Sequence, residues 1–141
     1  VYKRQLYETM KLSFSCSSPG KARWKQLSQQ HCGYCVPCLI RRAAMHKAFG
    51  DDGTVYTETS IYEMQNKNAE GMGIQLRSFQ YAIDKIKQDR NRALFYIHKP
   101  GPLPQDDEYL RKLADTYIRG LLEVDAFIQD NLAQEDENND L

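Results

Sequence analysis

The sequence predicts a mostly α-helical fold with a small metal knot near its N-terminal end. Two observations carry this prediction. Apolar residues recur at helical spacing in several segments, and one such stripe runs from Leu110 to Leu132. All four cysteines lie within residues 16–38. The chain has 141 residues, 41 % of them hydrophobic, which is enough for one domain with its own core.

The expected elements follow in order along the chain. We expect helices over residues 1–11, 22–29, 36–49, 74–90 and 106–132, a short strand at 12–15, and a short helix or strand at 93–98. Gly50 should end the third helix, and Asp106 or Asp107 should cap the last one. Residues 100–104 contain three prolines and must break whatever precedes them.

Charge is distributed unevenly, although the net charge is zero. Residues 1–50 carry nine Lys or Arg against a single acid, Glu8, whereas residues 51–141 carry ten bases against eighteen acids. A basic half can attract phosphates or an acidic partner. Equally, the two halves can pair with each other, or the acids can lie on solvated helix faces.

The cysteines follow the pattern C-x15-C-x2-C-x2-C, formed by Cys16, Cys32, Cys35 and Cys38. The two C-x2-C steps bring three thiols into one tight loop, which Gly33 permits, and Cys16 arrives from another segment. Four thiolates in a tetrahedron are the preferred ligands of zinc. With no open position, such a Zn²⁺ would be structural rather than catalytic, so we predict no catalytic residue.

Other interpretations of the cysteines stay open. Four cysteines allow three disulfide pairings, a C-x2-C-x2-C run also occurs in iron–sulfur proteins, and one cysteine alone could act as a nucleophile. His31 could replace one cysteine as a ligand, but we expect it to be a solvent-facing loop residue. Arg41 and Arg42 follow Cys38 by about one helical turn. We predict that they stabilise the thiolates, or that one of them faces a phosphate or a substrate carboxylate.

These residues resemble a known family. Ser15-Cys16, the run Cys32-Gly33-Tyr34-Cys35-Val36-Pro37-Cys38-Leu39-Ile40-Arg41, and Ala48-Phe49 are similar to the C-terminal zinc segment of 7-cyano-7-deazaguanine synthase (QueC). The resemblance covers about residues 13–49. The family's nucleotide-binding loop, Ser-Gly-Gly-x-Asp-Ser, is absent from this chain. The long helical extension after Cys38 looks more like the QueC-like proteins of anti-phage defence operons (QatC).

The resemblance implies a parent enzyme of the α/β nucleotide-α-hydrolase type, of which this chain is a C-terminal fragment. Such enzymes use ATP to adenylate a carboxylate, and in QueC the product is the nitrile of a 7-deazaguanine used in queuosine biosynthesis. ATP would bind only through the missing N-terminal domain, so the fragment alone should be inactive. The implied organisation is a zinc-knot segment at 1–50 that ends the QueC-like domain, a loop at 51–72, a helical extension at 73–133 and a disordered acidic tail at 134–141.

We therefore interpret the chain as the zinc-binding C-terminal portion of a QueC-like ATP-dependent ligase, of the antiviral defence type. Its partners would be the missing nucleotide-binding domain and either a second copy or another protein of a defence complex. No apolar run has the length of a membrane span, and we expect a cytoplasmic protein. The alternative is a zinc-knuckle module that binds nucleic acid or a protein. Against this alternative, aromatic residues are sparse among the basic ones, where only Trp24 and Tyr34 lie. A free-standing structural module is the third interpretation.

Overall fold

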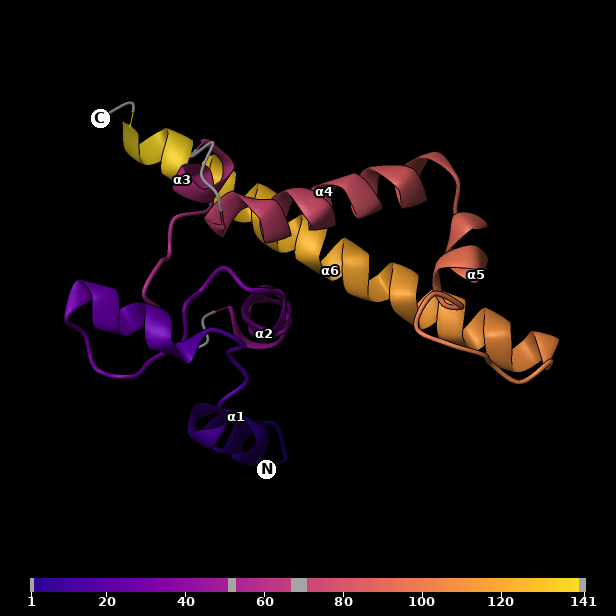
Figure 1. Ribbon diagram of the computed structural model, residues 1–141, viewed down its shortest axis with the longest axis horizontal. Helices are drawn as coiled ribbons and strands as arrows, with labels where there is room; N and C mark the ends of the chain where they lie inside the picture. The colour runs from indigo at the N-terminus through magenta and orange to yellow at the C-terminus, as the bar shows by residue number, and fades with distance from the viewer. Residues whose placement is uncertain (1, 51–52, 67–70, 140–141) are drawn as a thin grey trace.

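A long C-terminal helix organises the described part of the chain (Figure 1). The computed structural model describes residues 2–50, 53–66 and 71–139, with side chains over 4–135 of that range. Its elements are α1 (Tyr2–Leu12), the 3-10 helix η1 (Pro19–Lys25), α2 (Val36–Phe49), α3 (Ile61–Asn66), α4 (Met72–Gln88), α5 (Arg92–Tyr96) and α6 (Asp107–Asn139). The fold is therefore mostly helical, as the sequence predicts, and no sheet forms among these residues.

Helices α2, α3, α4 and α5 all pack against α6, and α3 also packs against α4. In Figure 1, α4 runs beside α6, while α2 lies against its other side. The buried stripe of α6 falls at helical spacing and comprises Ala114, Ile118, Leu121, Val124, Phe127 and Ile128. Leu76, Ile83 and Ile86 of α4 and Leu39 and Ala43 of α2 belong to the same core.

The predicted helix boundaries at α2 and α6 have identifiable causes. Gly50 adopts a positive φ of 81°, and its N–H donates to the His46 carbonyl at 2.8 Å, which ends α2. Asp106 is the residue that caps α6, because its Oδ1 accepts from the N–H groups of Glu108 and Tyr109, both at 3.0 Å. The end of α2 and the start of α6 could both be predicted from the sequence, since each depends on residues that are neighbours along the chain.

Helix α1 lies apart from the α6 core, at the N-terminal end of the molecule (Figure 1). Its side chains reach α2 through Tyr7, whose ring lies 4.9 Å from that of Phe49. The predicted strand at 12–15 does not form: α1 continues to Leu12, and Ser13 turns back to bond the Met10 carbonyl at 3.0 Å. The predicted helix at 22–29 is instead the 3-10 helix η1, which starts earlier, at Pro19.

The structure differs from the expected loop at 51–72 and the expected disordered tail at 134–141. Helix α3 lies inside the first range and buries Ile61 and Met64. Helix α6 continues to Asn139, and the last two residues lie outside the described part. Two hydrogen bonds link these two segments: Glu135 Oε2 accepts from Ser60 Oγ at 3.0 Å and from the Tyr62 N–H at 3.1 Å.

Of the helices that the described residues form, none combines the length and the apolar character required to cross a membrane.

Candidate metal centre

The four cysteine sulfurs converge on one point near the N-terminal end of α2. Cys16 lies in the loop between α1 and η1, Cys32 and Cys35 lie in the loop that enters α2, and Cys38 lies in the first turn of α2. All four Sγ atoms lie within 4.8 Å of one another, and Cys32, Cys35 and Cys38 are buried. The four-cysteine cluster that the spacing predicts is thus present.

The sulfur positions have the dimensions of a tetrahedral site for one ion. The Sγ atoms of Cys32 and Cys38 are 4.0 Å apart, and so are those of Cys16 and Cys35. A tetrahedron of sulfurs at about 2.3 Å from a central zinc has edges of about 3.8 Å. A disulfide requires about 2.05 Å, and all four cysteines are free. An iron–sulfur cluster is larger than a single ion and would need its cysteine sulfurs farther apart.

Backbone N–H groups point at the sulfurs. Cys16 Sγ accepts from the N–H groups of Ser18 and Cys32, both at 3.3 Å, and Cys32 Sγ accepts from the Cys35 N–H at 3.4 Å. Such bonds favour the charged thiolate, which is the form that binds a metal. The loop therefore orients the sulfurs and also stabilises their negative charge.

The protonation of the cluster is shared among neighbouring thiols. A hydrogen bond from the Cys38 thiol lowers the pKa of Cys32 to about 5, and the same bond, together with burial, raises the pKa of Cys38. Burial raises the pKa of Cys16. Cys32 therefore loses its proton more readily than an ordinary thiol, whereas Cys16 and Cys38 hold theirs more strongly. A bound cation would have to displace those protons, so binding must weaken in acid.

Gly33 sits where no other residue fits. Its φ is +89°, and a Cβ at this position would lie 1.9 Å from the carbonyl oxygen of Glu58. Backbone bonds pull the two segments together here: the Thr57 N–H donates to the His31 carbonyl at 2.8 Å, and the Glu58 N–H to the Cys32 carbonyl at 3.1 Å. Residues 56–58 thus support the cysteine loop, which the sequence did not indicate.

His31 is buried, so the expectation of a solvent-facing residue is wrong. Its ring packs against Phe14 at a centroid distance of 4.4 Å and against Tyr56 at 5.7 Å. Its Nδ1 lies 3.8 Å from Cys38 Sγ. The ring therefore lines the cluster beside one sulfur, and the four sulfurs alone already match the number of ligands that a structural zinc takes. Two aromatic partners that are distant in sequence account for its burial.

Arg41 and Arg42 are both buried, and each donates hydrogen bonds to carbonyl or hydroxyl oxygens. Arg41 donates to the Met10 carbonyl, to Ser13 Oγ at 2.7 Å and to Thr54 Oγ1 at 3.2 Å, which joins α1 and residue 54 to α2. Arg42 donates to the carbonyl oxygens of Gly33, at 3.1 Å, and Thr59, at 2.5 Å. Arg42 therefore steadies the cysteine loop through its backbone. The thiolate-stabilising and phosphate-binding roles predicted for the two arginines stay predictions.

Tyr34 and Trp24, the two aromatic residues that lie among the bases in the sequence, differ sharply in exposure. Tyr34 is buried, and burial followed by the neighbouring thiolate charges raises the pKa of its phenol to about 12. Trp24, on η1, is 86 % exposed. Trp24 therefore does not pack on the metal loop.

Several bases of the first fifty residues pair with acids of the later part. Lys25 contacts Glu58, Lys47 lies 2.7 Å from Glu123, and His46 lies 2.9 Å from Asp130. Lys25 and Lys47 are two of the nine bases of residues 1–50, and Lys11 pairs instead with Glu8 of the same half. Pairing between the halves thus accounts for part of the basic charge, while Lys21 and Arg23 are exposed.

Comparisons with known proteins found no match for this chain. No protein-family model matches the chain, and neither a curated protein nor a solved structure does.

Proposed function

We propose that Cys16, Cys32, Cys35 and Cys38 bind one structural Zn²⁺ ion that ties the loop after α1 to the start of α2. The observation that carries this proposal is the convergence of four free sulfurs within 4.8 Å. The zinc would have no open coordination position and would stabilise the fold instead of reacting. Because α2 packs on α6, the ion would also fix the position of the whole N-terminal part on the helical core.

Metal analysis of the purified protein tests this proposal. We expect one zinc per chain and a colourless solution, whereas an iron–sulfur cluster would make the protein brown. Replacing zinc by Co²⁺ should give the visible absorption of a tetrahedral thiolate site. A protein free of bound metal, or one that contains iron, contradicts the proposal.

For the function of the whole molecule, we propose the C-terminal portion of a QueC-like ATP-dependent ligase acting on a deazapurine carboxylate or a related substrate, of the defence type. The support is the cysteine motif with its glycine, arginine and Ala-Phe end over about residues 13–49. Sequence N-terminal to Val1 should then contain Ser-Gly-Gly-x-Asp-Ser. A DNA-binding domain in that position would contradict the proposal.

One observation favours the binding-module alternative. Trp24 is exposed and directly follows Arg23, and both Arg23 and the nearby Lys21 are exposed and form no ion pair among the residues described. An exposed aromatic ring beside cations is a surface on which a nucleic-acid base can stack. This alternative requires single-stranded RNA binding that falls steeply with salt and is lost in Trp24→Ala. Absence of binding at low salt excludes it.

A further inference from the structure

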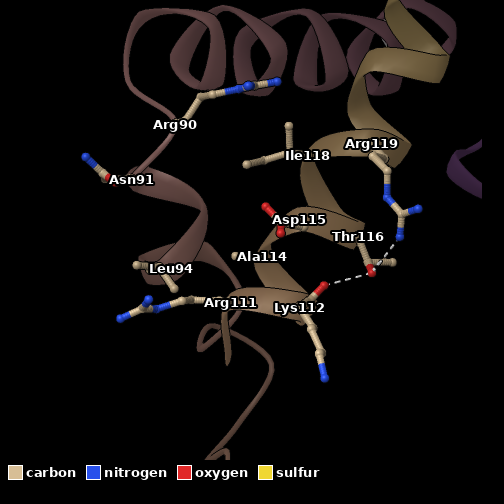
Figure 2. A pocket seen from close by; sticks show the side chains of 10 residues that line it. All are labelled: Arg90, Asn91, Leu94, Arg111, Lys112, Ala114, Asp115, Thr116, Ile118 and Arg119. Atoms are coloured by element: carbon tan, nitrogen blue, oxygen red, sulfur yellow. Dashed lines mark hydrogen bonds between the residues drawn. The ribbon is translucent and has the colours of Figure 1, made fainter. Parts of the chain in front are cut away.

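A basic cavity lies far from the cysteines, between the end of α4, α5 and the first half of α6 (Figure 2). Its volume is about 800 Å³. Arg90, Arg111 and Arg119 line it, together with an apolar floor of Leu94, Ala114 and Ile118. Figure 2 shows the Arg111 side chain extending toward Leu94 and the Arg119 side chain extending the other way, to Thr116, with Arg90 above Ile118.

The arginines of this cavity have almost no anionic partner. Arg90 and Arg111 form no ion pair with any described residue, and Arg119 donates to Thr116 Oγ1 at 3.2 Å. Asp115 is the single carboxylate on the lining. Residues 51–141 carry a net negative charge, so unpaired arginines gathered at one place here are unexpected. Of the bases in residues 1–50, by contrast, Arg41 and Arg42 are buried, and Lys25 and Lys47 form ion pairs.

Asp115 cannot neutralise the cavity by itself. Arg111, Asp115 and Arg119 are spaced four residues apart on α6, so they share one helix face, and the two arginines lie about 12 Å apart along the axis. Exposed pairs at this spacing stabilise a helix only slightly. One carboxylate can balance one guanidinium, so the arginines that line the cavity exceed their single carboxylate by two.

We propose that this cavity binds a small organic phosphate of about nucleotide size. The arginine fork matches phosphate oxygens in two parallel hydrogen bonds, which makes arginine well suited to this anion. The apolar floor can cover the organic part of the ligand. A volume of about 800 Å³ lies in the range of small-molecule sites, which favours a nucleotide-sized ligand over a macromolecule. This proposal goes beyond the metal centre and does not depend on it.

Calorimetric titration with ATP, tripolyphosphate and adenosine tests the proposal on the full chain. In about 50 mM salt we expect ATP to bind with a Kd below about 1 mM, more tightly than tripolyphosphate, while adenosine alone binds weakly. The double variant Arg111→Gln/Arg119→Gln should weaken ATP binding at least about tenfold. The matched control Arg4→Gln/Lys21→Gln removes two exposed cations elsewhere and should leave the Kd unchanged.

A second variant distinguishes a ligand-binding site from a row of charges on α6 that only pair with one another. Asp115→Asn removes the one repelling carboxylate and should tighten ATP binding about two- to fivefold. If Asp115 serves only to pair with its arginines, the variant lowers the melting temperature and leaves ATP affinity unchanged, which overturns the proposal. It is also overturned if ATP does not bind at about 1 mM, if the control pair weakens binding equally, or if tripolyphosphate binds as tightly as ATP. Tighter binding of single-stranded RNA through the same arginines would assign the cavity to nucleic acid instead.

Discussion

The guanidinium of Arg42 donates to the carbonyl oxygen of Gly33 across 3.1 Å, so a side chain of α2 holds the loop that carries Cys32 and Cys35. The same guanidinium lies 4.8 Å from the ring of Phe127 on α6. One buried side chain therefore links the cysteine loop, α2 and the long C-terminal helix. This link gives a physical reason for the metal centre to affect the stability of the helical core as well as its own loop.

Removing a single cysteine should release the metal. We expect Cys35→Ser to lose zinc and to lower the melting temperature of residues 12–49 by about 10 °C or more, because zinc-binding energy is folding energy in small knots. Hydrogen exchange should show the α4–α6 core surviving longer than this segment. Gln29→Ala, an exposed substitution in the same segment, serves as the control. Unchanged melting with unchanged zinc content in Cys35→Ser would refute the metal site.

Gly33 should tolerate no side chain. Gly33→Ala places a Cβ against the Glu58 carbonyl and keeps a positive φ, and we expect a loss of about 2–4 kcal/mol in the free energy of unfolding. Gly20→Ala is the matched control, since nothing lies within 4 Å of its added Cβ and it should be near neutral. Chemical denaturation of the zinc-loaded proteins measures both. Equal stability of the two variants would mean that residues 56–58 do not support the loop.

Loss of Arg42 should act on stability. Arg42→Met keeps much of the volume but leaves the Gly33 and Thr59 carbonyls without their donor, and we expect a cost of about 2–5 kcal/mol. Arg23→Met, at an exposed position, should change stability by less than about 0.5 kcal/mol. A variant Arg42→Met that folds as stably as the wild type would point instead to a binding role for this arginine.

Alkaline pH should weaken the packing between α5 and α6. Burial, followed by the neighbouring Tyr96, raises the pKa of Tyr117 above its ordinary value near 10. The neutral phenol is favoured in the folded state, so this contribution is complete below pH 10 and is lost as pH rises above it. We expect Tyr117→Phe to flatten the fall in stability above pH 10, measured by denaturation at stepwise pH. Tyr81→Phe, at an exposed ring, should keep the wild-type pH dependence.

Local patterns explain which predictions succeeded. The end of α2 could be predicted because Gly50 terminates it. The start of α6 could be predicted because Asp106 precedes a regular apolar stripe. The cysteine cluster was predictable because the two C-x2-C steps place three sulfurs within one loop. The strand at 12–15 failed because alternation of apolar and polar residues says nothing about whether a partner strand exists.

By itself, the sequence determined the helical class, the stripe of α6 and the cluster of four cysteines, since each follows from spacing along the chain. Only the tertiary structure decided that His31 is buried between Phe14 and Tyr56, and that the buried Arg41 and Arg42 donate to Ser13 Oγ and to the Gly33 carbonyl. It also decided that Arg90, which follows α4, lines one cavity together with Arg111 and Arg119 of α6. These outcomes depend on contacts between residues far apart in the chain, and burial and pairing of charges are set by such contacts.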